Sequence, residues 1–422
     1  MRSWDTDRII DTNEQWSNDA YHLPFSPPVS GPVQPARVRI ESVDVLRGVI
    51  MIIMALDHVR EFVGNGANPT DILSTTGPLF FTRWITHFCA PVFFLLTGTG
   101  AFLSLRRKSI PELSHFLWTR GVWLIFLETV VTRCLGWQFN FDYRLTLLFV
   151  LWALGWSMIA LAALIRLPVK VVTTFGIVLI IAHNLFDGVN PASFGSLSWL
   201  WQILHVPGVL FSTPRFTVFE AYPLIPWIGV TAAGYGLGQI FEWNSERRRA
   251  FLLRLGAGLS AAFVVIRAIN VYGDPNRWAV QRSAEFTVLS FLNVTKYPPS
   301  LLFLLMTLGP AMLFLRAMDR ETSPLLRPAL VIGKVPMFYY ILHITVAHAL
   351  AVIICYAQYG DAHWMFQSPQ LSQYPITPPQ GWGFGLPGVY ATWILVVVIL
   401  YPACVWYSRL KQRRSDWWLS YI

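Results

Sequence analysis

Long apolar runs separated by short polar connections make up most of this chain. A transmembrane helix needs about 20 mainly apolar residues, and these runs are of that length. The pattern predicts about ten membrane-spanning helices, at 43–64, 79–104, 115–135, 144–166, 168–186, 222–242, 250–272, 298–316, 329–356 and 389–408. The apolar stretch 199–212 is shorter and is interrupted by Pro207-Gly208, so we expect a re-entrant or interfacial segment there rather than a further span.

The composition supports a membrane protein. Of 422 residues, 54% are hydrophobic and 13% are charged, and the mean hydropathy is +0.48. A soluble globular domain has about 25% charged residues. The 19 Trp, 15 Tyr and 29 Phe include many near the ends of apolar runs, which is typical of interfacial aromatic belts. We therefore predict an all-α, polytopic transmembrane helix bundle in the lipid bilayer.

Basic residues are concentrated in alternate connections, as the positive-inside rule expects for cytosolic loops. The basic groups are Arg37/Arg39, Arg106-Arg107-Lys108, Arg166/Lys170, Arg247-Arg248-Arg249, Arg316/Arg320/Arg327 and Arg409/Lys411/Arg413/Arg414. The connections 65–78 and 357–388 contain no Lys or Arg, although 273–297 is an exception. This bias predicts cytosolic N- and C-termini. It also accounts for the net charge of +9 without a nucleic-acid partner.

The ends of the apolar region suggest a simple domain organisation. Residues 1–37 combine several acidic residues with a Pro-rich stretch and lack a signal-peptide pattern, so we expect a largely disordered cytosolic tail. Residues 38–422 would form the transmembrane domain. The four cysteines lie in apolar runs without CxxC spacing, which favours buried thiols over disulfides or a zinc site, and we expect no metal.

The first span contains the most informative polar residues, Arg47 and Asp57-His58. An ionisable group within a membrane costs several kcal/mol unless it has a partner, so such a group is a candidate functional residue. Eleven residues of helix return to within about 20° of the starting direction, so Arg47 and His58 share one face, roughly 16 Å apart along the axis. A cation near one membrane surface and an imidazole near the other suit a reaction that crosses the bilayer.

His58 is the predicted proton acceptor, because imidazole takes protons from hydroxyl or amine groups near neutral pH. Asp57 points about 100° away from its neighbour, so Glu61, at i+3, has better geometry to orient the ring. His87 in the second span is expected at a similar depth and would face His58 if the two spans form a hairpin. The alternative is that each histidine simply bonds a neighbouring carbonyl group.

Arg47 and Asp44 lie at the other end of the same span. An arginine there is suited to the phosphates of a cytosolic donor, because guanidinium binds phosphate through paired hydrogen bonds and stays charged. The alternative is an arginine that reaches the interface and pairs with Asp44 at i+3.

Further candidates lie late in the chain. Lys296 precedes the eighth span and would contact either an acceptor substrate or a lipid headgroup. In the ninth span, Tyr339 precedes His343 by one helical turn, and His343 and His348 point 140° apart. We expect His343 nearer the inner surface and His348 at the depth of His58.

These residues resemble a known superfamily. The stretch 39–48 followed by His58 resembles the first-helix signature of transmembrane acyltransferases, and 38–422 is similar to bacterial proteins of the DUF1624 group. That group is related to the catalytic domain of heparan-α-glucosaminide N-acetyltransferase. The matching stretches are 86–93, 222–229, 296–301, 333–343 and 417–421.

The resemblance implies an acetyltransferase of a bacterial inner membrane. Acetyl-CoA would be the cytosolic donor, and an amine or hydroxyl of a glycan on the far side would be the acceptor. The resemblance implies that Arg47 and His58 are the functional arginine and histidine of the family, with His58 as general base or as acyl carrier. A transporter that uses the same polar residues is the alternative function, although the broken segment 222–227 has no repeat-related partner. A non-catalytic scaffold is a third hypothesis, and a homo-oligomer is left open.

Overall fold

The computed structural model describes residues 40–320, 323–368, 380–414 and 416–421. The predicted N-terminal tail, 1–37, and the basic residues Arg37 and Arg39 lie outside the described residues. The boundary predicted between residues 37 and 38 therefore stays a prediction.

The fold is dominated by helices, and each of the predicted apolar runs contains one. The α-helices are α1 (Glu41–Val63), α2 (Gly77–Thr86), α3 (Cys89–Ser104), α4 (Ile110–Phe126), α5 (Val150–Leu164), α6 (Val169–Ala182), α7 (Ser198–Leu204), α8 (Leu224–Leu237), α9 (Ser245–Ile269), α10 (Ala284–Leu292), α11 (Leu301–Met318), α12 (Arg327–Lys334), α13 (Pro336–Tyr359) and α14 (Leu386–Arg413). The all-α membrane architecture is confirmed in this respect.

Among the described residues, seven helical segments are long and apolar enough to cross a membrane. The helix α1 is not among them, because it contains six charged residues and is too polar by that measure for a typical span. The helix α5 is apolar but has only 15 residues. The total of about ten spans and the orientation of the termini thus remain predictions.

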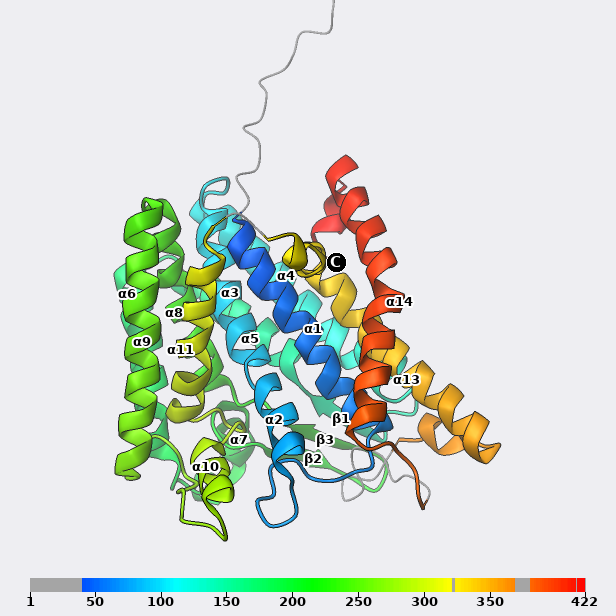
Figure 1. The fold of residues 1–422 in the computed structure, drawn as a ribbon. Helices are drawn as coiled ribbons and strands as arrows, with labels where there is room; N and C mark the ends of the chain where they lie inside the picture. Colours follow the sequence, from blue (N-terminus) through cyan, green and yellow to red (C-terminus); the bar gives the residue numbers. More distant parts are fainter. Residues whose placement is uncertain (1–39, 321–322, 369–379, 415, 422) are drawn as a thin grey trace, which may run out of the picture. The chain divides into compact units, whose positions relative to one another are not determined.

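The helix α1 lies in the middle of the bundle (Figure 1). It packs against α2, α3, α11, α12, α13 and α14. In the view of Figure 1, α6, α9 and α11 lie to one side of α1, and α13 and α14 lie to the other. The predicted first span is consequently surrounded by protein, which is where intramembrane charges are tolerated.

Glycine allows α1 and α12 to touch backbone to backbone. A Cβ atom on Gly48 would overlap the carbonyl group of Ala329, and one on Gly333 would overlap the carbonyl oxygen of Asp44. Small residues permit such close approach between membrane helices. This contact holds the start of α1 against the segment that leads into α13.

The predicted ninth span, 329–356, is two helices rather than one. The helix α12 ends at Lys334, and α13 begins at Pro336. Between them Val335 adopts φ −132° and ψ 49°, and the proline ring disfavours a helical conformation for the preceding residue.

A three-stranded sheet was not expected from the apolar pattern. It consists of β1 (Leu145–Leu148), β2 (Gly208–Ser212) and β3 (Thr217–Glu220), in the order β1-β3-β2. The strand β3 is parallel to β1, with Leu148 opposite Glu220, and antiparallel to β2. The stretch 199–212 therefore contains α7 and β2 and is not a further span, because the chain leaves the helix before Pro207-Gly208.

Candidate active site

His58 on α1 and His343 on α13 are directly hydrogen-bonded. Nδ1 of His58 lies 2.7 Å from Nε2 of His343, and Nδ1 of His343 lies 3.0 Å from the carbonyl oxygen of Tyr339. A carbonyl oxygen only accepts hydrogen bonds, so a neutral His343 has its proton on Nδ1 and accepts at Nε2. His58 then donates from Nδ1, which leaves the lone pair of its Nε2 available as a base.

The depth predicted for His343 is wrong. We expected this histidine near the inner surface, but it lies level with His58. Nη1 of Arg47 lies 3.3 Å from the carbonyl oxygen of Gly333, which sets the two segments in register at that end. His58 is eleven residues after Arg47, and His343 is ten residues after Gly333. The two histidines therefore lie at similar depths.

His58 faces a cavity of about 370 Å³. The ring of His58 is partly exposed, whereas His343 is fully buried behind it. Trp137 lies against the edge of His58, with ring centroids 5.0 Å apart. The π-helix η1 (Leu127–Trp137) positions this tryptophan at its last residue, and π-helical turns are frequent at functional sites. Other cavity walls come from Asp57, Glu61, Arg83, Tyr222, Lys296, Tyr297 and Tyr340.

The acidic neighbours of His58 bind arginines instead of the imidazole. Asp57 pairs with Arg83 on α2 and with Arg60 at 3.1 Å, and Glu61 pairs with Arg60 at 2.5 Å. The predicted contact by which Glu61 would orient His58 is therefore not found among the described residues. Arg60 thus binds both carboxylates and Arg83 binds Asp57, and His343 takes the orienting position.

The other predicted residues divide into those at the cavity and those elsewhere. Lys296 lines the His58 cavity. Tyr339 does not line it, but its ring stacks on His343 with centroids 5.4 Å apart. His87 ends α2 and lies against Phe303, at 5.4 Å between ring centroids, and it is not among the cavity-lining residues. The predicted meeting of His87 with His58 is not found in the described structure, because His343 occupies that position.

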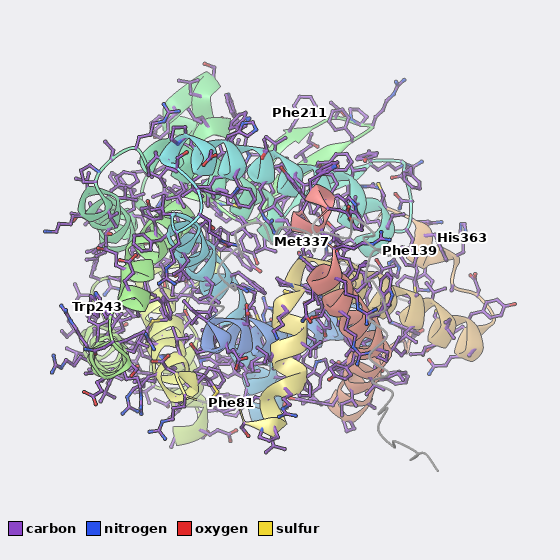
Figure 2. All side chains as sticks on the ribbon, turned by 90° about the horizontal axis from the view of Figure 1, so that it is seen from above. Phe81, Phe139, Phe211, Trp243, Met337 and His363 are labelled. Carbon is purple, nitrogen blue, oxygen red and sulfur yellow. The ribbon has the colours of Figure 1, made fainter. Side chains whose placement is uncertain are left out.

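His348 bonds carbonyl groups. Its Nδ1 lies 2.7 Å from the oxygen of Gly136, and its Nε2 lies 3.1 Å from that of Met365. Its ring stacks between Phe62, at 4.6 Å, and Phe139, at 4.0 Å; Phe139 is labelled in Figure 2. These contacts fit the alternative that this histidine bonds neighbouring carbonyl groups and has a structural role.

Arg47 lines a second cavity, of about 330 Å³. Arg47 donates to Asp44 at 2.7 Å, which is the pair that the alternative interpretation of Arg47 expected. The cavity also includes three further cations, Arg120, Lys334 and Lys411. Met337, another wall residue, lies among the central helices when the bundle is viewed from above (Figure 2).

The two cavities are neighbours. Val150 and Tyr340 line both of them, so these two side chains form the partition between the Arg47 cavity and the His58 cavity. A third cavity, of about 520 Å³, shares Glu61 and Arg83 with the His58 cavity. Three cavities therefore follow one another along α1, with His58 in the middle one.

Sequence reasoning missed several residues of this site. Arg83 lies within an apolar run, so the signal that identified Arg47 also applied to it. Trp137 and Tyr340 carried no such signal, because aromatic residues are common in membrane helices. Glu128, a further charged residue in an apolar run, accepts from the backbone of Leu151 at 2.8 Å.

Two further arginines in apolar runs are held by groups in the connections between helices. Arg133 donates to Asn140 and pairs with Asp142 at 3.2 Å. Arg267 donates to four backbone carbonyl groups and lies 3.9 Å from Asp274. These guanidinium groups hold loops at helix ends, where carbonyl oxygens outnumber carboxylates.

The family comparison is consistent with this geometry. The family model for the catalytic region of heparan-alpha-glucosaminide N-acetyltransferase matches residues 39–269, more than half of the chain. The chain belongs to this family. The match includes Arg47, His58 and Arg83, and it ends before Lys296 and His343. No curated protein matches the sequence. Family membership and the apolar helices together make the protein an integral-membrane enzyme of the transferase type.

Proposed function

We propose that this protein transfers an acetyl group from acetyl-CoA, bound at the Arg47 cavity, to an amine or hydroxyl of a glycan that reaches the His58 cavity. The observation that carries the proposal is the pair of adjoining cavities on α1, separated by Val150 and Tyr340. Arg47 and His58 are eleven residues apart on that helix, or about 16 Å along its axis.

The residues of the Arg47 cavity fit a phosphorylated donor. Four cations line it and no carboxylate is among the described lining residues. Arginine and lysine bind phosphate through charge-assisted hydrogen bonds. A cavity of about 330 Å³ is too small for the whole of acetyl-CoA, so the nucleotide would stay at the cations while the acyl-bearing arm extends toward Tyr340.

His58 has the geometry of a general base in this reaction. The acceptor N–H or O–H gives its proton to Nε2 of His58 as the acceptor attacks the thioester carbon. The carbon–sulfur bond then breaks, and the sulfur receives the proton from His58 and leaves as free CoA thiol. The hydrogen bond from Nδ1 to His343 keeps the ring in the tautomer that this step needs.

The other cavities fit a polar acceptor. Asp57, Glu61 and Lys296 offer hydrogen-bonding groups around His58, and the third cavity provides an approach that passes Glu61 and Arg83. The distribution of Lys and Arg supports a cytosolic Arg47 end, so the acceptor would arrive from outside a bacterial inner membrane.

Ligand-induced stabilisation tests the donor. The purified protein in detergent should unfold at a higher temperature with CoA, because a ligand that binds only the folded state stabilises it by about 2.7 kcal/mol at 100 times its Kd. Dephospho-CoA, which lacks one phosphate, is the matched control and should stabilise less. Absence of any shift with CoA would contradict the donor assignment and favour a transporter.

Transfer itself is tested with labelled acetyl-CoA and glucosamine, a simple amino sugar. Labelled N-acetylglucosamine should form only with the protein present. Mass spectrometry of envelope glycans from cells with and without the protein then identifies the natural acceptor. Labelled protein that forms before acceptor is added, and does not form with His58→Ala, would instead indicate that His58 carries the acetyl group.

A further inference from the structure

Three potential metal ligands meet on the side of the bundle formed by α6 and α7. His183 begins the short 3₁₀ helix η2 (His183–Phe186) that follows α6, Asp187 comes directly after η2, and His205 follows the last residue of α7. One ligand atom from each of the three residues lies within 4.8 Å of the others.

The two histidines are buried without hydrogen bonds. Each is only 1% exposed, and none of their four ring nitrogens has a hydrogen-bond partner among the described residues. A buried polar group without a partner costs about 1–3 kcal/mol. A cation between the rings would satisfy one nitrogen of each histidine.

We propose that His183, Asp187 and His205 bind a divalent transition-metal ion, and that zinc is the best match. Two imidazoles and one carboxylate are a common zinc ligand set, with a water molecule in the fourth position. Nε2 of His205 lies 3.3 Å from Oδ1 of Asp187. Bonds of about 2.0–2.1 Å in a tetrahedron would separate two ligand atoms by about 3.4 Å, so this pair already has the required spacing.

Asn184 supports the carboxylate in the orientation that a metal needs. Its Nδ2 donates to Oδ2 of Asp187 at 2.8 Å, which leaves Oδ1 directed at His205. Its Oδ1 accepts from the backbone N–H of Leu301 at 2.8 Å. Hydrogen bonds of this kind orient metal ligands and commonly change affinity by about 10–100-fold.

The ion would fasten a wall of the His58 cavity. His205 lies two residues before Pro207, which lines that cavity, and Asn184 is bonded to the start of α11. A metal at His183 and His205 would thus tie α6, α7 and α11 together beside the site. Its expected role is structural, and it is independent of which acetyl acceptor the protein uses.

The cysteine spacing offered no zinc signal, and for that reason we expected no metal. His183 and Asp187 are four residues apart, but the third ligand is eighteen residues further on. Only the packing of α7 beside the end of α6 brings His205 to them.

Metal content of the purified full chain is the first test. The protein should be purified without a polyhistidine tag, stripped with a chelator and titrated with zinc chloride alone. We expect about one zinc per chain by elemental analysis, as three protein ligands and one water complete the site. His205→Gln and Asp187→Asn should weaken zinc binding by more than about 100-fold, and Asn184→Ala by about 10–100-fold. The exposed His115→Gln and His363→Gln are matched controls and should bind as the unaltered protein does.

Cobalt provides a test that does not depend on a variant losing its ion. His205→Cys keeps a ligand at the same position, so cobalt(II) should bind and show a thiolate-to-cobalt charge-transfer band that the unaltered protein lacks. Absence of saturable zinc binding by the unaltered protein would overturn the proposal. So would equal zinc affinity of the unaltered protein and His205→Gln, or a cobalt spectrum that His205→Cys leaves unchanged.

Discussion

The cavities around Arg47 and His58 lie along one helix but differ in charge. The described walls of the Arg47 cavity contain four cations and no acidic residue. The His58 cavity combines two acidic residues, Asp57 and Glu61, with two basic ones, Arg83 and Lys296, and Asp57 pairs with Arg83. The difference indicates a division of labour. A surplus of positive charge attracts a polyanion, whereas a balanced site with one orientated imidazole is suited to moving a proton.

The largest expected effect is that of removing the base. His58→Ala should lower kcat for acetyl transfer to glucosamine by roughly 10²–10⁴-fold, which is the usual contribution of a general base. Stabilisation by CoA should be unchanged, because the donor cations are on the other side of Tyr340. The exposed His115→Ala serves as the control. Unchanged turnover in His58→Ala would remove this residue from the mechanism.

The orientating histidine should matter less than the base. His343→Ala removes the acceptor for Nδ1 of His58, which should cost about 1–3 kcal/mol and lower kcat roughly tenfold to a hundredfold. His348→Gln is the matched comparison on the same helix, because it bonds only carbonyl groups. It should lower the unfolding temperature but not kcat. An equal loss of kcat in both variants would contradict an orienting role for His343, because it would show that any destabilisation of α13 lowers turnover.

Arg47 tests the other side of the comparison. Arg47→Ala should raise KM for acetyl-CoA about tenfold or more, since a hydrogen bond to a charged group contributes about 1.5–3 kcal/mol. The effect on KM should shrink at high salt. The KM of Arg47→Lys should lie between that of the unaltered protein and that of Arg47→Ala. Exposed Arg107→Ala is the control. A fall in kcat with KM unaltered would contradict a donor-binding role.

Glu220 gives the most local effect, which is on stability and not on turnover. It lies in β3 beside the His58 cavity, and burial raises the pKa of its carboxyl group from 4.5 to about 9. Between these values the folded protein holds a proton that the unfolded chain releases, so rising pH favours unfolding. Glu220→Gln removes this dependence. The unfolding temperature of the unaltered protein should therefore fall relative to Glu220→Gln as pH rises from 5 to 9, and parallel profiles would contradict it.

Much of the donor end could be predicted from the sequence, because it depends on residues close together in one helix. Arg47 and Asp44 form the pair expected at i+3, and both Arg47 and His58 face cavities, as the eleven-residue spacing predicted. The partners of His58 could not be predicted in this way. Glu61 had suitable helical spacing, but Arg60 binds it, and His343 reaches His58 from a helix almost three hundred residues away.

By itself the sequence determined the membrane class of the protein, the positions of its apolar helices and the stripe that joins Arg47 to His58. Hydrophobicity and helical periodicity are local properties, so neighbouring residues are enough to establish them. Only the tertiary structure decided which imidazole holds His58, that the ninth apolar run is broken, and that His205 meets His183. These contacts depend on how closely separate helices approach, as at Gly48 and Gly333, and no local pattern encodes that distance.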